Sequence, residues 1–375
     1  MSKVLIYTTG TGGGHLQCAK VLEGRFISRG YEVVIIDFLK EINLNLDKFI
    51  VNFNYLITGK LPKIYGHLYY GFDNKINQKK FINLLIKVSR KSIYNNIILE
   101  NPDLIIGTHS FLNGIIGYLK ENNLIDIPFV SLITDYKLHQ NHIHEYVDAY
   151  ITGCDSLTEE FVNRNIPKDR IHPYGIPIRE EFLIKTHNTN MNNTFQVLVM
   201  GGSSGLRGMK KSIRSLSTMQ RDLHITVVCG SNIRLKEYFE DEYEKIIEEG
   251  KLTVYGYYND IASLMRNSQV LITKPGGISI TEAMYMGLPI IVPYFIPGQE
   301  KENLKYLIDK GLGIYIKDQN DLSLLIEDLM DNIYILETMK TNMINTRIDY
   351  SEMNIINLCE DLILSNGNGG GLNAL

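Results

Sequence analysis

Short runs of aliphatic and β-branched residues, each followed by a glycine-rich turn and an amphipathic stretch, occur at the start of this chain and again in its second half. Residues 3–8 (KVLIYT) lead into the turn 10–14 (GTGGG), and residues 196–200 (QVLVM) lead into the turn 201–208 (GGSSGLRG). This order is typical of parallel βαβ units. Two separate starts of that kind in 375 residues predict an α/β protein of two doubly wound, Rossmann-like domains.

The remaining strand-like runs follow the same scheme. A helix is expected at about 15–29, and a second strand is expected to end at Asp37. Further strands are expected at 103–107, 128–133 and 148–152 in the first domain, and at 223–229, 252–255, 269–273, 289–293 and 313–316 in the second. Because ligands of such sheets bind beyond the carboxyl ends of the strands, we expect the chemistry in a cleft that both domains face.

The polar stretch 186–194 (THNTNMNNT) marks a boundary between the two domains. We expect an N-terminal domain at 1–180, a linker at 181–195 and a C-terminal domain at 196–345. A helix at about 346–365 is able to pack back on the N-terminal domain. The tail 366–375 lacks periodicity and is expected to be disordered.

Composition excludes several other classes of protein. A hydrophobic fraction of 44% with 21% charged residues excludes a mainly disordered chain. The four cysteines lie far apart and match neither a disulfide framework nor zinc spacing, so reduced thiols and a cytoplasmic location are expected. No apolar run reaches the roughly 18–20 residues of a spanning helix. The first residues are typical of a strand rather than a signal peptide.

The net charge of −4 is unevenly distributed along the chain. Residues 48–98 carry nine Lys or Arg against the single acid Asp73, a net charge of +8 that leaves −12 for the remainder. Aromatic residues lie between these charges, and an apolar helical stripe is formed by Phe81, Leu84, Leu85 and Val88. Such a segment suits an anionic membrane surface. The candidate contacts are Lys63, Lys79, Lys80, Lys87 and Arg90.

This basic segment has two other interpretations. The stripe is also compatible with a solvated helix that covers the core of the N-terminal domain. Nucleic acid is disfavoured as a partner, because no recognition motif accompanies the charge.

The first two glycine-rich turns are candidate anion sites. Gly14 and His15 stand where the first helix begins, and His15 occupies the position that a dinucleotide fingerprint gives to glycine. The positive end of a helix disfavours the imidazolium ion, so His15 is a candidate base, or else a plain helix cap. In the second turn, Gly202, Ser203 and Ser204 offer amides and hydroxyls to phosphate oxygens.

A third turn, 273–283 (TKPGGISITEA), is the densest group of polar and glycine residues. Glu282, one turn into the next helix, can accept the two hydroxyls of a ribose while the preceding amides face a diphosphate. Gln299 and Glu300 begin a later helix and can hold sugar hydroxyls. The alternative for Glu282 is a favourable interaction with the helix dipole only.

In this order the motifs resemble the GT-B glycosyltransferases of the monogalactosyl- and processive monoglucosyl-diacylglycerol synthase type, and more distantly the peptidoglycan N-acetylglucosaminyltransferase. The resemblance extends to about residue 360. It rests on GTGGGH at 10–15, THSF at 108–111, ITDYKLH at 133–139, His144, Asp148, YGIPIREEF at 174–182, GG at 201–202, GY at 256–257, TKPGG at 273–277, TEA at 281–283, GLPII at 287–291 and IPGQEKEN at 296–303.

This resemblance implies an inverting transfer of a hexose from a UDP-sugar to the hydroxyl of diacylglycerol or a glycosyl-diacylglycerol, without metal or other cofactor, at the inner face of the cell membrane. It implies that Glu282 binds the ribose, that Tyr257 lies at the uracil, and that Gln299 and Glu300 bind the sugar. The diphosphate and the rest of the donor would be held by Gly14, Gly202, Ser203, Ser204, Lys274, Gly276, Gly277, Ile278 and Thr281.

Two acid–base candidates stand in the N-terminal half. The resemblance implies that His15 is the general base or a group that positions the acceptor hydroxyl; Asp135 is either the rival base or the group that orients His15. His139 borders the expected acceptor site. The histidines at 139, 142 and 144 suggest a metal cluster, but Asp135 is the only nearby carboxylate expected to join it, and the resemblance implies that no metal is needed, so we expect none.

One position departs from the family pattern. Where the related lipid synthases carry Trp between the two histidines of this segment, the chain has His142, and it contains no Trp. A different lipid or a soluble acceptor is therefore the first alternative. A UDP-sugar epimerase and a non-catalytic UDP-sugar sensor of the same fold are the others.

Overall fold

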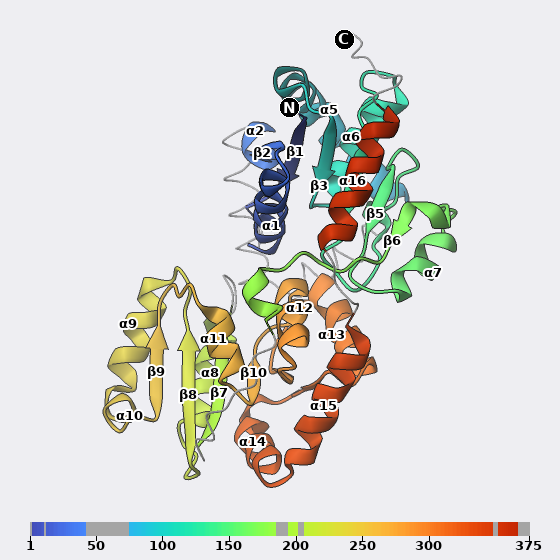
Figure 1. Cartoon of the computed structure of the whole chain (residues 1–375). Coiled ribbons are helices and arrows are strands. Elements are labelled where there is room, and N and C mark those ends of the chain that lie inside the picture. Colours follow the sequence, from blue (N-terminus) through green and yellow to red (C-terminus); the bar gives the residue numbers. More distant parts are fainter. Residues whose placement is uncertain are drawn as a thin grey trace. The chain divides into compact units, whose positions relative to one another are not determined.

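The computed structural model describes residues 2–10, 13–42, 75–184, 194–201, 206–347 and 352–366. The chain forms two compact units (Figure 1). One unit comprises Met1–Ile178 with Ile348–Leu375, and the other comprises Arg179–Arg347. Each unit is built on one parallel β-sheet with helices packed on it.

The first unit holds a parallel sheet of order β2-β1-β3-β4-β5-β6. Its strands are β1 (Lys3–Thr8), β2 (Glu32–Asp37), β3 (Leu104–Gly107), β4 (Phe129–Leu132), β5 (Ala149–Ile151) and β6 (Ile171–His172). Its helices are α1 (Gly14–Ser28), α2 (Phe38–Ile42), α5 (Lys75–Glu100), α6 (Phe111–Glu121), α7 (Ser156–Val162) and α16 (Glu352–Asn366), with 3₁₀ turns η1 (Gln140–His142) and η2 (Lys168–Arg170). The central strands β3 and β4 are buried throughout, as is typical of a parallel sheet whose two faces are covered by helices.

The second unit repeats the design with a sheet of order β12-β11-β10-β7-β8-β9. Its strands are β7 (Phe195–Met200), β8 (Leu223–Val228), β9 (Leu252–Tyr255), β10 (Val270–Ile272), β11 (Ile290–Val292) and β12 (Gly313–Tyr315). Its helices are α8 (Leu206–Leu216), α9 (Ile233–Glu242), α10 (Glu244–Glu248), α11 (Ile261–Arg266), α12 (Gly277–Met286), α13 (Gln299–Asp309), α14 (Leu322–Asp331) and α15 (Ile333–Thr346), with 3₁₀ turns η3 (Glu180–Phe182) and η4 (Gln319–Asp321).

The predicted α/β class and the predicted strands are confirmed. Each predicted strand is present within about one residue of its expected bounds, and the first helix spans Gly14–Ser28 instead of 15–29. The pattern missed β6, which is only two residues long. The residues 43–74, 185–193 and 367–375, which include much of the basic segment, the linker and the tail, lie outside the described residues.

The last helix returns to the first unit. Figure 1 shows α16, in red, beside elements from the N-terminal half, and it packs against α1 and β3. Its buried residues Ile355, Ile356 and Cys359 complete that side of the core.

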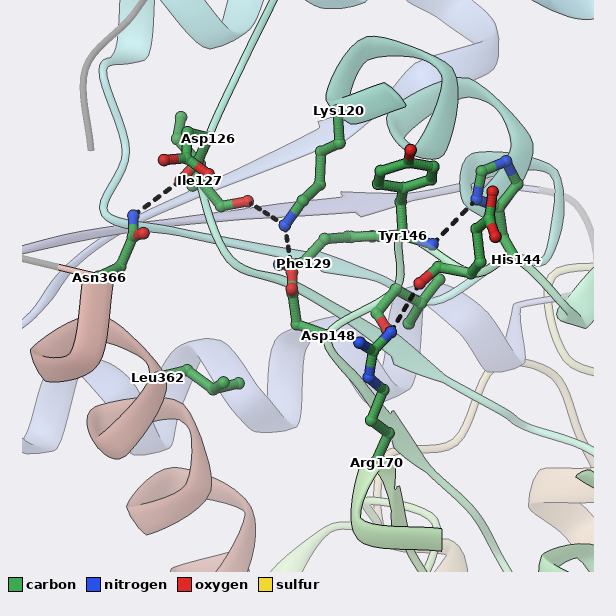
Figure 2. Close-up of polar contacts among 12 residues, drawn as sticks. Lys120, Asp126, Ile127, Phe129, His144, Tyr146, Asp148, Arg170, Leu362 and Asn366 are labelled. Atoms are coloured by element: carbon green, nitrogen blue, oxygen red, sulfur yellow. Dashed lines mark hydrogen bonds and ion pairs between the residues drawn. The ribbon is translucent and has the colours of Figure 1, made fainter. Parts of the chain in front are cut away.

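Asp148, one of the residues that carry the family resemblance, joins several elements at the amino edge of the first sheet (Figure 2). Its Oδ2 accepts a hydrogen bond of 2.7 Å from the Phe129 amide and pairs with the Lys120 ammonium. Lys120 also donates to the Ile127 carbonyl at 3.1 Å. Asp148 therefore fixes the starts of β4 and β5 to the end of α6, at the edge opposite the glycine turns.

Candidate active site

The turn after β1 is held by a carboxylate at the end of β2. The Gly10 amide donates to Asp37 Oδ2 at 3.0 Å, and a Cβ on Gly10 would lie 3.0 Å from the same oxygen. Gly13 has a φ of +72°, which favours glycine at that position. The described part of the turn thus depends on glycine at two positions and on Asp37, to which sequence reasoning gave no role.

His15 lies in the first turn of α1 and is partly exposed. Its Nδ1 is 3.3 Å from the Thr134 hydroxyl, and its ring meets the His109 ring edge-on at 4.9 Å between centroids. Burial lowers the pKa of His15, while the charge of Asp135 and a hydrogen bond to the Thr108 backbone oppose that shift. The result is a neutral imidazole at neutral pH, able to accept a proton.

Asp135 follows β4 and is only 7% exposed. Its charge is the strongest influence that favours protonation of His15. The structure therefore brings the two predicted acid–base residues together in one unit. A neutral histidine beside a buried carboxylate is the arrangement in which the carboxylate stabilises the imidazolium that forms when the base is protonated.

His109, from the THSF motif, is a further neighbour that sequence reasoning left without a role. Its Nδ1 accepts a hydrogen bond from the Phe111 amide at 3.3 Å, and the centroid of its ring lies 5.9 Å from the centroid of the Phe38 ring. Burial and the nearby His15 hold the pKa of His109 well below its ordinary value. This neutral ring packs His15 against the end of β3.

His139 and His142 form a reciprocal cap around η1. The His139 amide donates to His142 Nδ1 at 3.0 Å, and His139 Nδ1 accepts from the Asn141 amide at 3.2 Å. Both side chains are 8% exposed. Burial, then the neighbouring His139, lower the pKa of His142 to about 3. The residue that stands in place of Trp is thus a neutral, buried part of the local structure.

In the second unit, the start of α12 offers backbone donors. Gly276 is the N-cap residue and the helix begins at Gly277, so the amides of its first turn have no partners within the helix. Ile278 is 9% exposed on this turn. The Thr281 hydroxyl donates to the Gly277 carbonyl at 2.8 Å, so its proton is engaged inside the helix.

Glu282, also on α12, is 5% exposed and lies beside a cation. Arg179 Nη2 is 4.0 Å from Glu282 Oε1, while Arg179 Nη1 donates to the Asn259 carbonyl at 3.1 Å. Arg179 belongs to the YGIPIREEF motif, but its spacing along the chain gave no sign of this contact. It connects the predicted ribose carboxylate to the loop after β9, where Tyr257 is 78% exposed.

Lys274 and Glu300, predicted to bind different parts of the donor, contact each other. Lys274 Nζ lies 2.5 Å from Glu300 Oε1, and Glu300 Oε2 accepts from the Ile296 amide at 2.8 Å. Gln299 begins α13 next to them, after Gly298 with a φ of +114°. The other predicted donor residues Gly202, Ser203 and Ser204 lie outside the described residues.

The predicted membrane residues are only partly described. Lys63 lies outside the described residues, and the side chains of Lys79 and Lys80 on α5 are not described. Lys87 is exposed, and Arg90 donates to the Tyr118 hydroxyl at 2.7 Å. The predicted apolar stripe is divided, because Leu85 is buried whereas Leu84 and Val88 are 58% and 45% exposed.

Two features are absent from the described ranges. These ranges hold no group of three or more His, Cys, Asp or Glu arranged to bind a metal ion. None of their helices is both long and apolar enough to cross a membrane.

Comparisons with known proteins assign both halves. Residues 15–178 match the family model of monogalactosyldiacylglycerol (MGDG) synthase, and residues 196–354 match that of the glycosyltransferase family 28 C-terminal domain. A processive diacylglycerol beta-glucosyltransferase of Bacillus pumilus (strain SAFR-032) is 31% identical over 370 residues, covering 96% of this chain and 94% of the relative. One of Bacillus cereus (strain ATCC 10987 / NRS 248) is 32% identical over 354 residues, covering 90% and 89%.

Solved structures agree on the fold. The crystal structure of MurG from Acinetobacter baumannii superposes with a TM-score of 0.64 at 14% identity, covering 96% of this chain and all of that one. The kitacinnamycin glycosyltransferase gives a TM-score of 0.65 at 12% identity, covering 96% and 99%. The fold is the GT-B fold of glycosyltransferases.

Proposed function

Because this chain belongs to the family of the monogalactosyldiacylglycerol synthases and processive diacylglycerol glucosyltransferases, we propose that it transfers a hexose from a UDP-sugar to the hydroxyl of diacylglycerol or a glycosyl-diacylglycerol, with inversion. The observation that carries this proposal is the neutral His15 beside the buried Asp135, in the unit that matches the MGDG synthase model.

The reaction is a single displacement. The acceptor hydroxyl gives its proton to His15 as its oxygen attacks the anomeric carbon of the sugar. The bond between that carbon and the UDP oxygen breaks, and the electron pair leaves with UDP. Asp135 stabilises the imidazolium ion that forms, which supports its role as the orienting group rather than the base.

The charge that develops on UDP needs stabilising donors. The amides of the first turn of α12, at Gly277 and Ile278, point along the helix axis toward its positive end. Lys274 adds a cation whose charge is shared with Glu300. These groups act without any step that requires a metal.

The remaining donor contacts follow the arrangement of the second unit. Glu282 accepts the ribose hydroxyls with Arg179 beside it, and the exposed Tyr257 ring stacks on uracil. Gln299 and Glu300 contact the hexose at the start of α13. Glu300 is already fixed by Lys274 and the Ile296 amide, so it is held in place before the sugar binds.

We also propose that one face of α5 docks on an anionic membrane. Leu84, Val88 and Leu99 are exposed on this helix and recur at helical spacing, with the exposed Lys87 and Lys91 among them. Apolar residues enter the interface while each lysine near an anionic surface contributes about 1 kcal/mol. This placement brings the unit that holds His15 to its lipid acceptor.

The burial of His142 bears on the acceptor. The His142 ring caps η1 and is buried. Having His in place of Trp therefore alters the local structure and places no charged group at the acceptor. We therefore favour diacylglycerol over a soluble acceptor.

The direct test supplies anionic vesicles containing diacylglycerol with UDP-glucose, UDP-galactose or UDP-N-acetylglucosamine in turn. UDP release and glycolipid mass are measured together. We expect UDP release together with glycolipid formation for one of the three UDP-sugars. UDP release without glycolipid would indicate another acceptor, and UDP binding without release from any donor would support a sensor and contradict the proposal.

A further inference from the structure

Tyr294, one residue beyond Pro293 at the end of β11, packs against both ends of the second glycine turn. A Cβ on Gly208 would lie 2.0 Å from Tyr294 Cδ1, and a Cβ on Gly201 would lie 3.3 Å from the Tyr294 hydroxyl oxygen. The ring therefore fills the space that a side chain at Gly208 would need. At Gly201, Met209 fills most of that space, with its Sδ 2.1 Å from the Cβ position, and the Tyr294 hydroxyl lies at its edge.

The hydroxyl of Tyr294 is the unusual part of this contact. Its oxygen is buried and has no hydrogen-bond partner in the portion of the chain that the structure describes. Burial, and then the charge of Glu300, raise the pKa of this phenol, so it keeps its proton and stays a donor. A buried donor without a partner is destabilising, and phenylalanine would fill the same space without that cost.

The nearby carboxylate oxygens do not accept a hydrogen bond from this hydroxyl. Glu300 Oε1 pairs with Lys274 and Glu300 Oε2 accepts the Ile296 amide, and neither oxygen hydrogen-bonds the phenol. The hydroxyl instead lies at Gly201, which follows the last residue of β7. In the sheet β10 pairs with β7 on one side and β11 on the other, so the carboxyl ends of these three parallel strands lie at one edge.

That edge suits an anion. The first turn of α12 supplies amides there, and the charge of Lys274 is already shared with Glu300. A neutral hydroxyl donor at this place adds a hydrogen bond to a phosphate oxygen. It adds no further positive charge, which would slow the release of UDP. The sugar hydroxyls, in contrast, have Gln299 and Glu300.

We propose that the Tyr294 hydroxyl donates a hydrogen bond to a non-bridging diphosphate oxygen of the bound UDP-sugar. Tyr294 is then a donor-binding residue whose ring also packs against Gly208. This inference rests on the proposed function, since it takes UDP as the ligand of the second unit.

The test compares the affinities of UDP and uridine, measured by calorimetry, for the full chain and for Tyr294→Phe. The variant keeps the ring and removes only the hydroxyl. We expect its Kd for UDP to rise roughly tenfold or more, as for the loss of a hydrogen bond to a charged group. Its Kd for uridine should stay unchanged, because uridine has no diphosphate.

The matched control is Tyr315→Phe, which removes a tyrosine hydroxyl from β12 in the same unit, away from the turn. It should bind both ligands as the unmodified chain does. An unchanged Kd for UDP in Tyr294→Phe would overturn the inference, and an equal loss for UDP and uridine would overturn it too, by indicating a structural role alone. Failure of the unmodified chain to bind UDP would instead contradict the proposed function.

Discussion

At the scale of single residues, the proposed catalysis depends on the protonation state of His15. The residue is partly exposed and neutral, with burial lowering its pKa and Asp135 opposing that effect. The motif GTGGGH was sufficient to single out His15 from the sequence. Its neighbours Thr134 and His109 come from distant parts of the chain, and no spacing rule reports such contacts.

Replacing His15 with Ala should abolish glycolipid formation while UDP binds with unchanged Kd, because the base acts only on the acceptor hydroxyl. Asp135→Asn should reduce kcat by a smaller factor, since His15 remains. Steady-state kinetics with calorimetry for UDP distinguish the two effects. His172→Ala, which removes a histidine from β6 in the same unit, is the control. Full activity of His15→Ala would contradict the assignment.

His142 gives a prediction about acid stability. Its pKa is about 3 in the folded chain and about 6.5 when unfolded. The unfolded chain therefore binds this proton first, so the stabilisation is complete above pH 6.5 and is lost as pH falls from there toward 3. The slope for one such group is at most about 1.4 kcal/mol per pH unit.

Chemical denaturation between pH 7.5 and 5 checks this expectation. The free energy of unfolding of the unmodified chain should fall more steeply below pH 6.5 than that of His142→Phe, which cannot titrate at this position. Parallel curves for the two proteins would show that His142 is not the neutral buried group inferred here.

At the scale of elements, the sequence predicted strands well because each is a compact apolar run between turn residues. It missed β6, whose two residues carry no pattern. The sequence also could not show which residues of the apolar stripe on α5 are buried. Leu84 and Leu85 are adjacent and equally apolar, yet only Leu85 is buried in the core. Tertiary packing, which a local pattern does not contain, decides such cases.

Removing the carboxylate at the start of β5 tests the contacts in Figure 2. Asp148→Ala leaves the Phe129 amide without its acceptor and leaves the Lys120 ammonium without its carboxylate, so that Lys120 keeps the hydrogen bond to the Ile127 carbonyl. The free energy of unfolding should fall by roughly 1.5–3 kcal/mol, as for hydrogen bonds to charged groups. Asp331→Ala, which breaks an exposed ion pair with Arg221, should change stability little. Equal effects of the two substitutions would contradict a supporting role for Asp148.

The exposed face of α5 is tested by liposome sedimentation. The double variant Leu84→Ser and Val88→Ser, and separately Lys87→Gln, should bind anionic vesicles more weakly, the latter mainly at low salt. The matched control is Leu324→Ser on α14, where Leu324 is 64% exposed in the other unit. Unchanged sedimentation of the α5 variants would refute docking by this face.

At the scale of the whole molecule, the two units have similar parallel sheets but hold different sets of candidate site residues. The first unit holds the proposed acid–base pair, His15 and Asp135, and the second holds the helix termini and carboxylates expected at a nucleotide sugar. The near-neutral total charge conceals a basic segment at 48–98, of which the structure describes the part from residue 75 onward. Sequence patterns singled out both sets of candidate residues, but they did not predict the pairing of Lys274 with Glu300.

The stereochemistry of the product distinguishes a single displacement with His15 as base from a reaction with retention. The anomeric configuration of the glycolipid formed from an α-linked UDP-hexose and diacylglycerol is read by NMR, with His15→Ala as the inactive control. A single displacement with His15 as base predicts a β-linked glycolipid, and none from the variant. An α-linked product, which requires retention, would contradict this mechanism.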